Sequence, residues 1–137
     1  MKSIVILIVL FFSCNMNSFA GAVSFTFDEG AYNSVSQPRL KYPINDAVIL
    51  SGNDPLEFKW WNDIEGIHGF TFKIYKGYNM YAVNLIHKEN LSSSASSVKI
   101  DSALFKDGEV YTWTLIQINS SGYKSDKSFN SFKVTKK

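Results

Sequence analysis

"EVYTWTLIQINSSG", residues 109–122, alternates large apolar side chains with polar ones and ends in a turn. Side chains two residues apart lie on the same face of a β-strand, so Tyr111, Trp113 and Leu115 share one face. The composition Ser-Ser-Gly at residues 120–122 is typical of turns. The stretch therefore predicts a strand with one buried aromatic face, followed by a tight turn.

The chain after residue 22 repeats this design of short alternating segments separated by turns. Segments rich in Phe, Val, Ile, Tyr and Trp are bounded by Gly, Pro, Asn, Asp and Ser. No segment has the sustained 3.6-residue period of an amphipathic helix. The spacing predicts an all-β sandwich of about seven short antiparallel strands. The strand-like segments are 23–27, 39–50 with a kink at Pro43, 56–60, 70–76, 81–87, 98–100, 109–119 and 128–134, and residues 90–97 are expected to form a Ser-rich loop.

The first 22 residues have the composition of a secretory signal peptide. Lys2 supplies a positive charge, and Ile4–Phe12 is an apolar run of nine residues. That run is much shorter than the roughly 20 residues that span a bilayer as a helix. The small residues in Ser18-Phe19-Ala20 and in Ala20-Gly21-Ala22 fit cleavage by a signal peptidase. The sequence therefore predicts export, with a secreted, periplasmic or extracellular mature protein.

Cys14 is the only cysteine, and it lies inside the signal segment, so the mature chain is expected to have no disulfide. Residues 11–14, FFSC, also loosely resemble a bacterial lipobox, although Phe11 stands where a lipobox usually has Leu. Ordinary cleavage after Ala20 or Ala22 is the favoured interpretation. The alternative is a lipoprotein anchored to a membrane through Cys14.

The charge distribution indicates which classes of partner the protein is expected to bind. The formal net charge is +2, and acidic and basic residues are interspersed along the chain. Nucleic-acid-binding proteins concentrate basic residues on one surface, and many peripheral membrane proteins carry a basic amphipathic helix. We therefore expect no nucleic-acid partner, and contact with a membrane only if Cys14 is lipidated.

The sequence does not suggest a catalytic or metal-binding constellation. His68 and His87 are the only histidines, and neither has a nucleophile or carboxylate at a spacing typical of catalysis. Two histidines without a mature cysteine do not make a structural zinc site. The acidic pairs at 63 and 65 and at 107 and 109 are sparser than the oxygen ligands that calcium requires. The prediction is a non-enzymatic protein without a cofactor or metal.

Four segments together resemble a fibronectin type III domain. QPRLKYPINDAVI (37–49) is similar to the family's opening strand, PLEFKW (55–60) to its second strand and GFTFKIYK (69–76) to its third. ALFKDGEVYTWTLIQINSSG (103–122) resembles the sixth strand and its approach. Gln117 departs from the pattern, and the chain has no Arg-Gly-Asp tripeptide. The resemblance divides the chain into a signal peptide at 1–22, an N-terminal extension or linker at 23–36 and a fibronectin type III-like, immunoglobulin-like domain at 37–137.

The resemblance implies structural roles for several aromatic residues. Tyr111 is expected to take the tyrosine-corner role, with its hydroxyl bonded to backbone near the preceding turn. Trp113 and Leu115 follow on the same face, and Trp60 is expected to pack opposite them. Each buried aromatic side chain removes roughly 150–250 Å² from water, which explains these residues better as scaffold than as a binding site. The expected core is Trp60, Phe70, Phe72, Leu104, Tyr111, Trp113 and Leu115.

Four further aromatic residues are not required by this core. Trp61 and Tyr75 alternate with buried neighbours and are expected on outer faces, and Tyr78 and Tyr81 follow within a few residues. Exposed aromatic rings stack on sugars or anchor protein partners. The alternative is cross-strand packing on a solvated face, or burial beneath residues 23–36.

The sequence thus supports three expectations of function. The first is an exported, non-enzymatic binding module that acts through loops or a sheet face on a protein or carbohydrate partner. The second is carbohydrate binding through Trp61, Tyr75, Tyr78 and Tyr81. The third is a structural or accessory subunit of a cell-surface assembly, bound through an exposed edge strand.

Overall fold

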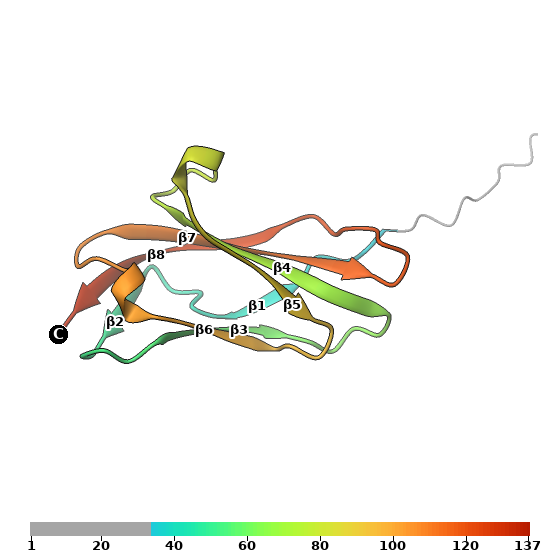
Figure 1. Ribbon diagram of the computed structural model, residues 1–137, viewed down its shortest axis with the longest axis horizontal. Coiled ribbons are helices and arrows are strands. Elements are labelled where there is room, and N and C mark those ends of the chain that lie inside the picture. Colours follow the sequence, from blue (N-terminus) through green and yellow to red (C-terminus); the bar gives the residue numbers. More distant parts are fainter. Residues whose placement is uncertain (1–33) are drawn as a thin grey trace, which may run out of the picture. The chain divides into compact units, whose positions relative to one another are not determined.

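The computed structural model describes residues 34–137, which form a sandwich of two β-sheets (Figure 1). The predicted all-β sandwich is confirmed. The signal peptide, Cys14 and the segment 23–27 lie outside the described residues. Within the described part of the chain, no helix has the length and hydropathy needed to cross a membrane.

The described residues form eight strands and two short 3-10 helices: β1 (Arg39–Tyr42), β2 (Ala47–Leu50), β3 (Leu56–Trp61), β4 (Ile67–Lys76), η1 (Ala82–Asn84), β5 (Leu85–Ser92), β6 (Ser97–Ile100), η2 (Ser102–Leu104), β7 (Val110–Asn119) and β8 (Ser128–Lys136). Sheet A has the strand order β1-β3-β6, and sheet B has the order β2-β8-β7-β4-β5. Pro43 follows β1 and has no backbone N–H to donate, so the segment 39–50 divides there between the two sheets. Neighbouring strands run antiparallel except β2, which lies parallel to β8 and so differs from the expected arrangement.

The chain between β4 and β6 also differs from the sequence prediction. The sequence predicts a strand at 81–87 and a loop at 90–97, but residues 82–84 form η1 and β5 continues to Ser92. β5 is an edge strand, and His87 and Glu89 lie opposite the buried residues Ile74 and Phe72 of β4. Polar residues at these inward positions hide the two-residue hydrophobic period that identifies a strand.

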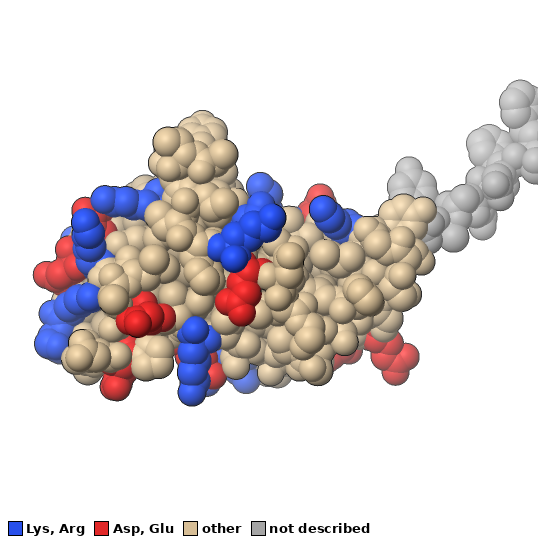
Figure 2. Space-filling view, in the orientation of Figure 1, with Lys and Arg blue, Asp and Glu red and all other residues tan. Residues whose placement is uncertain are grey.

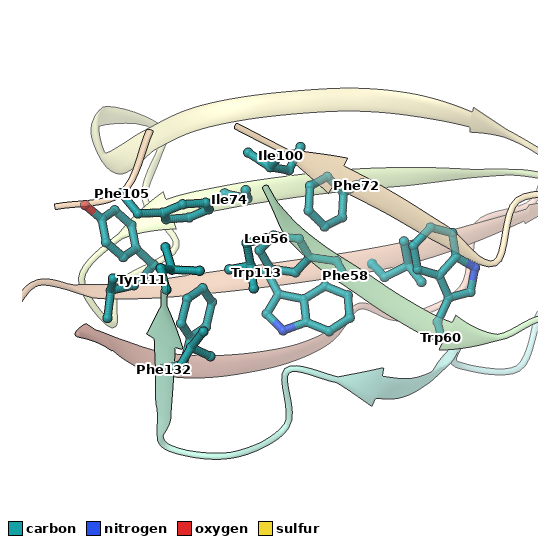
Figure 3. Packing of buried hydrophobic residues seen from close by; sticks show 14 of the residues in the cluster. Leu56, Phe58, Trp60, Phe72, Ile74, Ile100, Phe105, Tyr111, Trp113 and Phe132 are labelled. Atoms are coloured by element: carbon teal, nitrogen blue, oxygen red, sulfur yellow. The ribbon is translucent and has the colours of Figure 1, made fainter. Parts of the chain in front are cut away.

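The two sheets face each other across an aromatic core (Figure 3). Phe58 of β3 is fully buried. Its ring centroid lies 5.0 Å from that of Phe72 on β4, 5.2 Å from Trp113 on β7 and 5.9 Å from Phe132 on β8. These edge-to-face contacts are a favourable geometry for aromatic rings, and they join the central strand of sheet A to three strands of sheet B.

One residue of the expected core is misplaced by the sequence prediction. Leu104 is only partly buried and packs against the core from its edge. The next residue, Phe105, is buried instead, with its ring centroid 5.1 Å from that of Tyr111. Residues 102–104 form η2, where the alternation of an extended strand does not apply. The buried members of the expected core are Trp60, Phe70, Phe72, Tyr111, Trp113 and Leu115.

Polar atoms of the core aromatic residues differ in their hydrogen bonding. Tyr111 Oη accepts a hydrogen bond from Lys106 N at 2.8 Å, which is the tyrosine-corner contact. Trp113 Nε1 donates to Pro43 O at 2.9 Å and ties β7 to the chain that follows β1. Trp60 Nε1 is buried and has no hydrogen-bond partner within residues 34–137. Only one of these two core indoles therefore gains stability from its N–H.

Replacing each of these tryptophans by phenylalanine tests this difference. Trp113→Phe leaves the Pro43 carbonyl without its partner, at a cost of about 1–3 kcal/mol in addition to the lost packing, whereas Trp60→Phe breaks no hydrogen bond. We expect Trp113→Phe to lower the free energy of unfolding by about 1 kcal/mol or more beyond the effect of Trp60→Phe, as measured by urea titration. Equal losses would show that the bond to Pro43 contributes nothing.

Candidate functional site

The connection between β4 and β5, residues 77–84, projects from the body of the sandwich (Figure 1) and is called the apolar loop below. Gly77 opens it with a φ of +81°, a left-handed conformation that glycine adopts without steric cost. Gly77 N donates to Val110 O at 2.7 Å, and Gly77 O accepts from Thr112 Oγ1 at 2.7 Å. The base of the loop is therefore fixed to β7.

Hydrogen bonds within the apolar loop hold its tip. Asn84 N donates to Tyr81 O at 2.9 Å, and Asn84 Nδ2 donates to Asn79 O at 3.0 Å. The η1 turn closes with Leu85 N donating to Ala82 O. A loop that is already ordered has less conformational freedom to lose when a partner binds.

The side chains at the tip are large, apolar and exposed. Tyr78 is 70% exposed, Tyr81 is 67% exposed and Val83 is 88% exposed. The segment from Gly77 to Ile86 contains no charged side chain, in a chain where 19% of residues are charged. Figure 2 shows the projecting part without Lys, Arg, Asp or Glu on the face in view. Clusters of exposed apolar side chains commonly mark interaction surfaces.

Tyr75 does not belong to this exposed surface. Only 6% of the surface of Tyr75 is exposed. Its neighbour Ile74 points to the opposite face of the sheet and is also buried, so both faces of β4 are covered here. Tyr75 lies between Leu85 of β5 and Thr112 of β7 in the sheet register, and Thr112 is itself fully buried. The expectation of an exposed Tyr75 is therefore wrong, because the outer face of β4 is covered at this position.

Trp61 lies on the outer face of sheet A and is 47% exposed. Lys41 Nζ lies 4.5 Å from the centroid of the indole, and Arg39 Cζ lies 5.6 Å from it. Arg39 also forms an ion pair with Asp63. Cations over an indole ring gain a cation–π attraction, so a sugar that stacks on Trp61 would compete with Lys41 and Arg39 for the ring.

The structure does not bring Trp61 together with Tyr78 and Tyr81. Trp61 ends β3 beside Trp60, whose ring packs 5.5 Å from Phe70 near the start of β4. The apolar loop follows the far end of β4, and an extended chain advances about 3.3 Å per residue. The Trp61 surface and the apolar loop therefore lie at opposite ends of the sandwich. The four aromatic residues predicted from the sequence form no common platform.

Glu57 on the outer face of sheet A interacts with two lysines. Lys59 Nζ lies 3.0 Å from Glu57 Oε2. The hydrogen bond from Lys59 holds the pKa of the Glu57 carboxyl below its usual value. Lys99 lies opposite Glu57 in the register and acts in the same direction. Glu57 therefore neutralises only part of the positive charge that Lys59 and Lys99 bring to this face.

The two histidines lie on neighbouring strands of sheet B. His68 is exposed on β4. His87 on β5 lies 3.3 Å from Glu89 Oε2 and makes an edge contact with the Phe72 ring. In the described part of the chain, no group of three or more His, Cys, Asp or Glu side chains is arranged to hold a metal ion.

Sequence reasoning singled out Tyr78 and Tyr81 but missed Val83, the most exposed of the three. Val83 was hidden because it falls in a segment that reads as a weak strand, where every second side chain is expected to be buried. The sequence signal that could have revealed this surface is the run from Gly77 to Ile86, which has no charged side chain.

Comparison with known structures gives the same fold. The chain is similar to a computationally redesigned β-sandwich protein, with a TM-score of 0.56 and 14% identity, covering 74% of this chain and 97% of that one. It is also similar to the fibronectin(III)-like modules of CbhA from Clostridium thermocellum, with a TM-score of 0.50 and 13% identity, covering 72% of this chain and 96% of that one. No protein-family model and no curated protein matches the sequence. The protein thus has the fold of fibronectin type III domains.

The cation–π contact of Trp61 is tested by a double-mutant cycle with Lys41. We expect Trp61→Ala and Lys41→Ala to be coupled by about 0.5–1 kcal/mol in the free energy of unfolding, since the ammonium group lies over the ring. The four proteins of the cycle are compared by urea titration at one salt concentration. Strictly additive effects of the two substitutions would rule out the contact as a stabilising one.

Proposed function

We propose that the protein is an exported, non-catalytic binding module that contacts a partner protein through the apolar loop. The observation that carries the proposal is the exposure of Tyr78, Tyr81 and Val83 on one projecting, uncharged loop. Exposing such side chains to water has no benefit for folding, because burial is what makes apolar surface stabilising. Contact with a partner supplies that burial.

The chemistry of the tip favours a partner protein with an apolar pocket. Tyrosine is enriched among the residues that dominate binding energy at protein interfaces, since its ring buries a large apolar area and its hydroxyl finds a hydrogen-bond partner at the rim. Val83 adds a branched aliphatic side chain to the same tip. A projecting tip of this kind fits a concave surface better than a flat one.

The two rival functions have less support. Carbohydrate stacking through the four predicted aromatic residues requires a shared surface, whereas Tyr75 is buried and Trp61 ends β3, away from the apolar loop. A structural subunit bound through β5, one of the two edge strands of sheet B, would meet the charged residues Lys88 and Glu89, whereas the other edge strand, β2, carries no charge. Charged side chains on an edge strand oppose pairing with another strand.

Site-specific photo-cross-linking tests the proposed contact. We expect a photoreactive phenylalanine analogue at position 81 to cross-link a partner protein in cells that produce the chain. The same analogue at Tyr123, an exposed residue outside the apolar loop, serves as the control. With the purified partner, Tyr78→Ser combined with Tyr81→Ser should raise Kd by about tenfold or more. Truncating a central aromatic residue of an interface costs over about 1 kcal/mol of binding free energy.

The control variant is Tyr123→Ser, which should change Kd by less than about twofold because surface substitutions away from the contact have small effects. Both variants alter exposed residues, so circular dichroism should show unchanged folding. Cross-linking from position 123 as strong as that from position 81, or an unchanged Kd in the double variant, would exclude the apolar loop as the contact.

Export is tested by the N-terminus of the mature protein. The favoured interpretation of residues 1–22 expects cleavage after Ala20 or Ala22, so intact-mass spectrometry should give an unmodified chain that starts at Gly21 or Val23. Cys14→Ser should leave this mass unchanged. A mature chain that begins at Cys14 and carries lipid would instead establish the lipoprotein alternative.

A further inference from the structure

The outer face of sheet B carries a second surface, separate from the apolar loop. A groove of about 580 Å³ crosses β5, β4 and β7. Three lysines line it, Lys73 from β4, Lys88 from β5 and Lys124 from the chain after β7, and no acidic residue does. The isoleucines at 116 and 118 of β7 are also part of the lining. The groove therefore combines positive charge with a partly apolar lining.

The positive charge of this groove is uncompensated. Lys73 and Lys88 lie directly opposite each other in the register of β4 and β5, an arrangement of like charges that destabilises a sheet. Neither of these lysines nor Lys124 has a carboxylate within 4.0 Å among residues 34–137. By contrast, Lys76 on the same strand pairs with Glu109 at 3.4 Å. A pair of lysines that destabilises the sheet and has no carboxylate partner within the described residues is suited to binding an anionic ligand.

Neutral hydrogen-bonding groups stand beside the lysines. Thr71 Oγ1 donates to Asn90 Oδ1 at 3.2 Å, which orients the Asn90 amide and directs its Nδ2 group away from that bond. Gly69 adds no side chain at one end of the groove, and a Cβ there would lie only 2.7 Å from Leu91 O. The close approach of β5 to β4 thus excludes a larger residue at position 69.

The backbone geometry of the groove restricts the class of ligand. β4 is paired with β5 on one side and with β7 on the other, so its backbone groups are already hydrogen-bonded and unavailable to an incoming peptide strand. A ligand on this face is bound by side chains alone. The lining includes no exposed Phe, Tyr or Trp ring on which a nucleic-acid base could stack, and the exposed ring that it does include is the small imidazole of His68. A chain with anionic groups and many hydroxyls satisfies lysine, threonine and asparagine together.

We propose that this groove binds an acidic polysaccharide, with Lys73 and Lys88 neutralising its anionic groups and Asn90 bonding to its hydroxyls. The site is independent of the apolar loop and of a partner protein bound there. Because a polyanion releases counterions when lysines neutralise it, the affinity should fall as salt rises.

The test is titration of the ¹⁵N-labelled domain with defined polymers, followed by two-dimensional NMR. The probes are polygalacturonate and dextran sulfate, with neutral dextran, poly-glutamate and oligothymidine as comparisons. We expect saturable shifts at residues 69–73, 88–92 and 116–124 with the two acidic polysaccharides, and none with neutral dextran. Lys73→Gln with Lys88→Gln should weaken binding by about tenfold, the effect of losing roughly 1.4 kcal/mol.

The matched control is Lys99→Gln with Lys106→Gln, which removes the same charge from exposed positions outside the groove. It should weaken binding by less than about twofold, since only screened long-range attraction is lost. Urea titration should show that Lys73→Gln with Lys88→Gln is at least as stable as the parent, because it removes a like-charge pair. No binding of either acidic polysaccharide in 50 mM salt, equal weakening by both double variants, or equally tight binding of poly-glutamate or oligothymidine would each overturn the proposal.

Discussion

Phe58 extends from the central strand of sheet A into the middle of the sandwich, where its ring contacts aromatic rings from β4, β7 and β8 and from the turn at Phe105. The domain is expected to fold without a disulfide, so contacts of this kind must supply most of the stability. They also set the registration of the two sheets, because edge-to-face rings tolerate little sliding. Both proposed binding surfaces stand on strands that this contact orients.

The fold was largely predictable because the buried strands have a recognisable two-residue hydrophobic period in the sequence. Residues 56–60, 70–74 and 111–115 alternate large apolar side chains with polar or charged ones, and each of the strands that contain them lies between two other strands of its sheet. The parallel pairing of β2 was not predictable. The pattern of a four-residue segment is too short to specify its partner strand, so the place of the segment in the fold decides the pairing. The predicted bounds of β5 were wrong because an edge strand does not need a fully apolar face, and its sequence therefore lacks a clear hydrophobic period. Phe105 replaced Leu104 because a 3-10 turn rotates successive side chains by less than an extended strand does.

Prediction of surfaces from the sequence was weaker, for a different physical reason. Alternation identifies the face on which a side chain lies, but it does not say whether that face is covered. Tyr75 points outward and is still buried beside Thr112, whose hydroxyl bonds both to Gly77 O and to Ser131 Oγ at 2.6 Å. The lysines of the groove were also invisible as a cluster, since they are 15 and 36 residues apart along the chain and meet only when β4, β5 and β7 pair. The even charge pattern of the sequence therefore concealed a local positive surface.

The orientation of that positive surface depends on the aromatic core. Side chains alternate along β4, so Lys73 points outward only because Phe72 and Ile74 point inward. A slip of one residue in the register of β4 would bury Lys73 and expose Phe72, at a large cost in free energy. The contact between Phe58 and Phe72 opposes that slip and therefore holds Lys73 opposite Lys88. The same register places Gly77 beside Val110 and Thr112, from which the apolar loop projects. The packing of Phe72 against Phe58 thus helps to determine which side chains β4 presents on the outer face of sheet B.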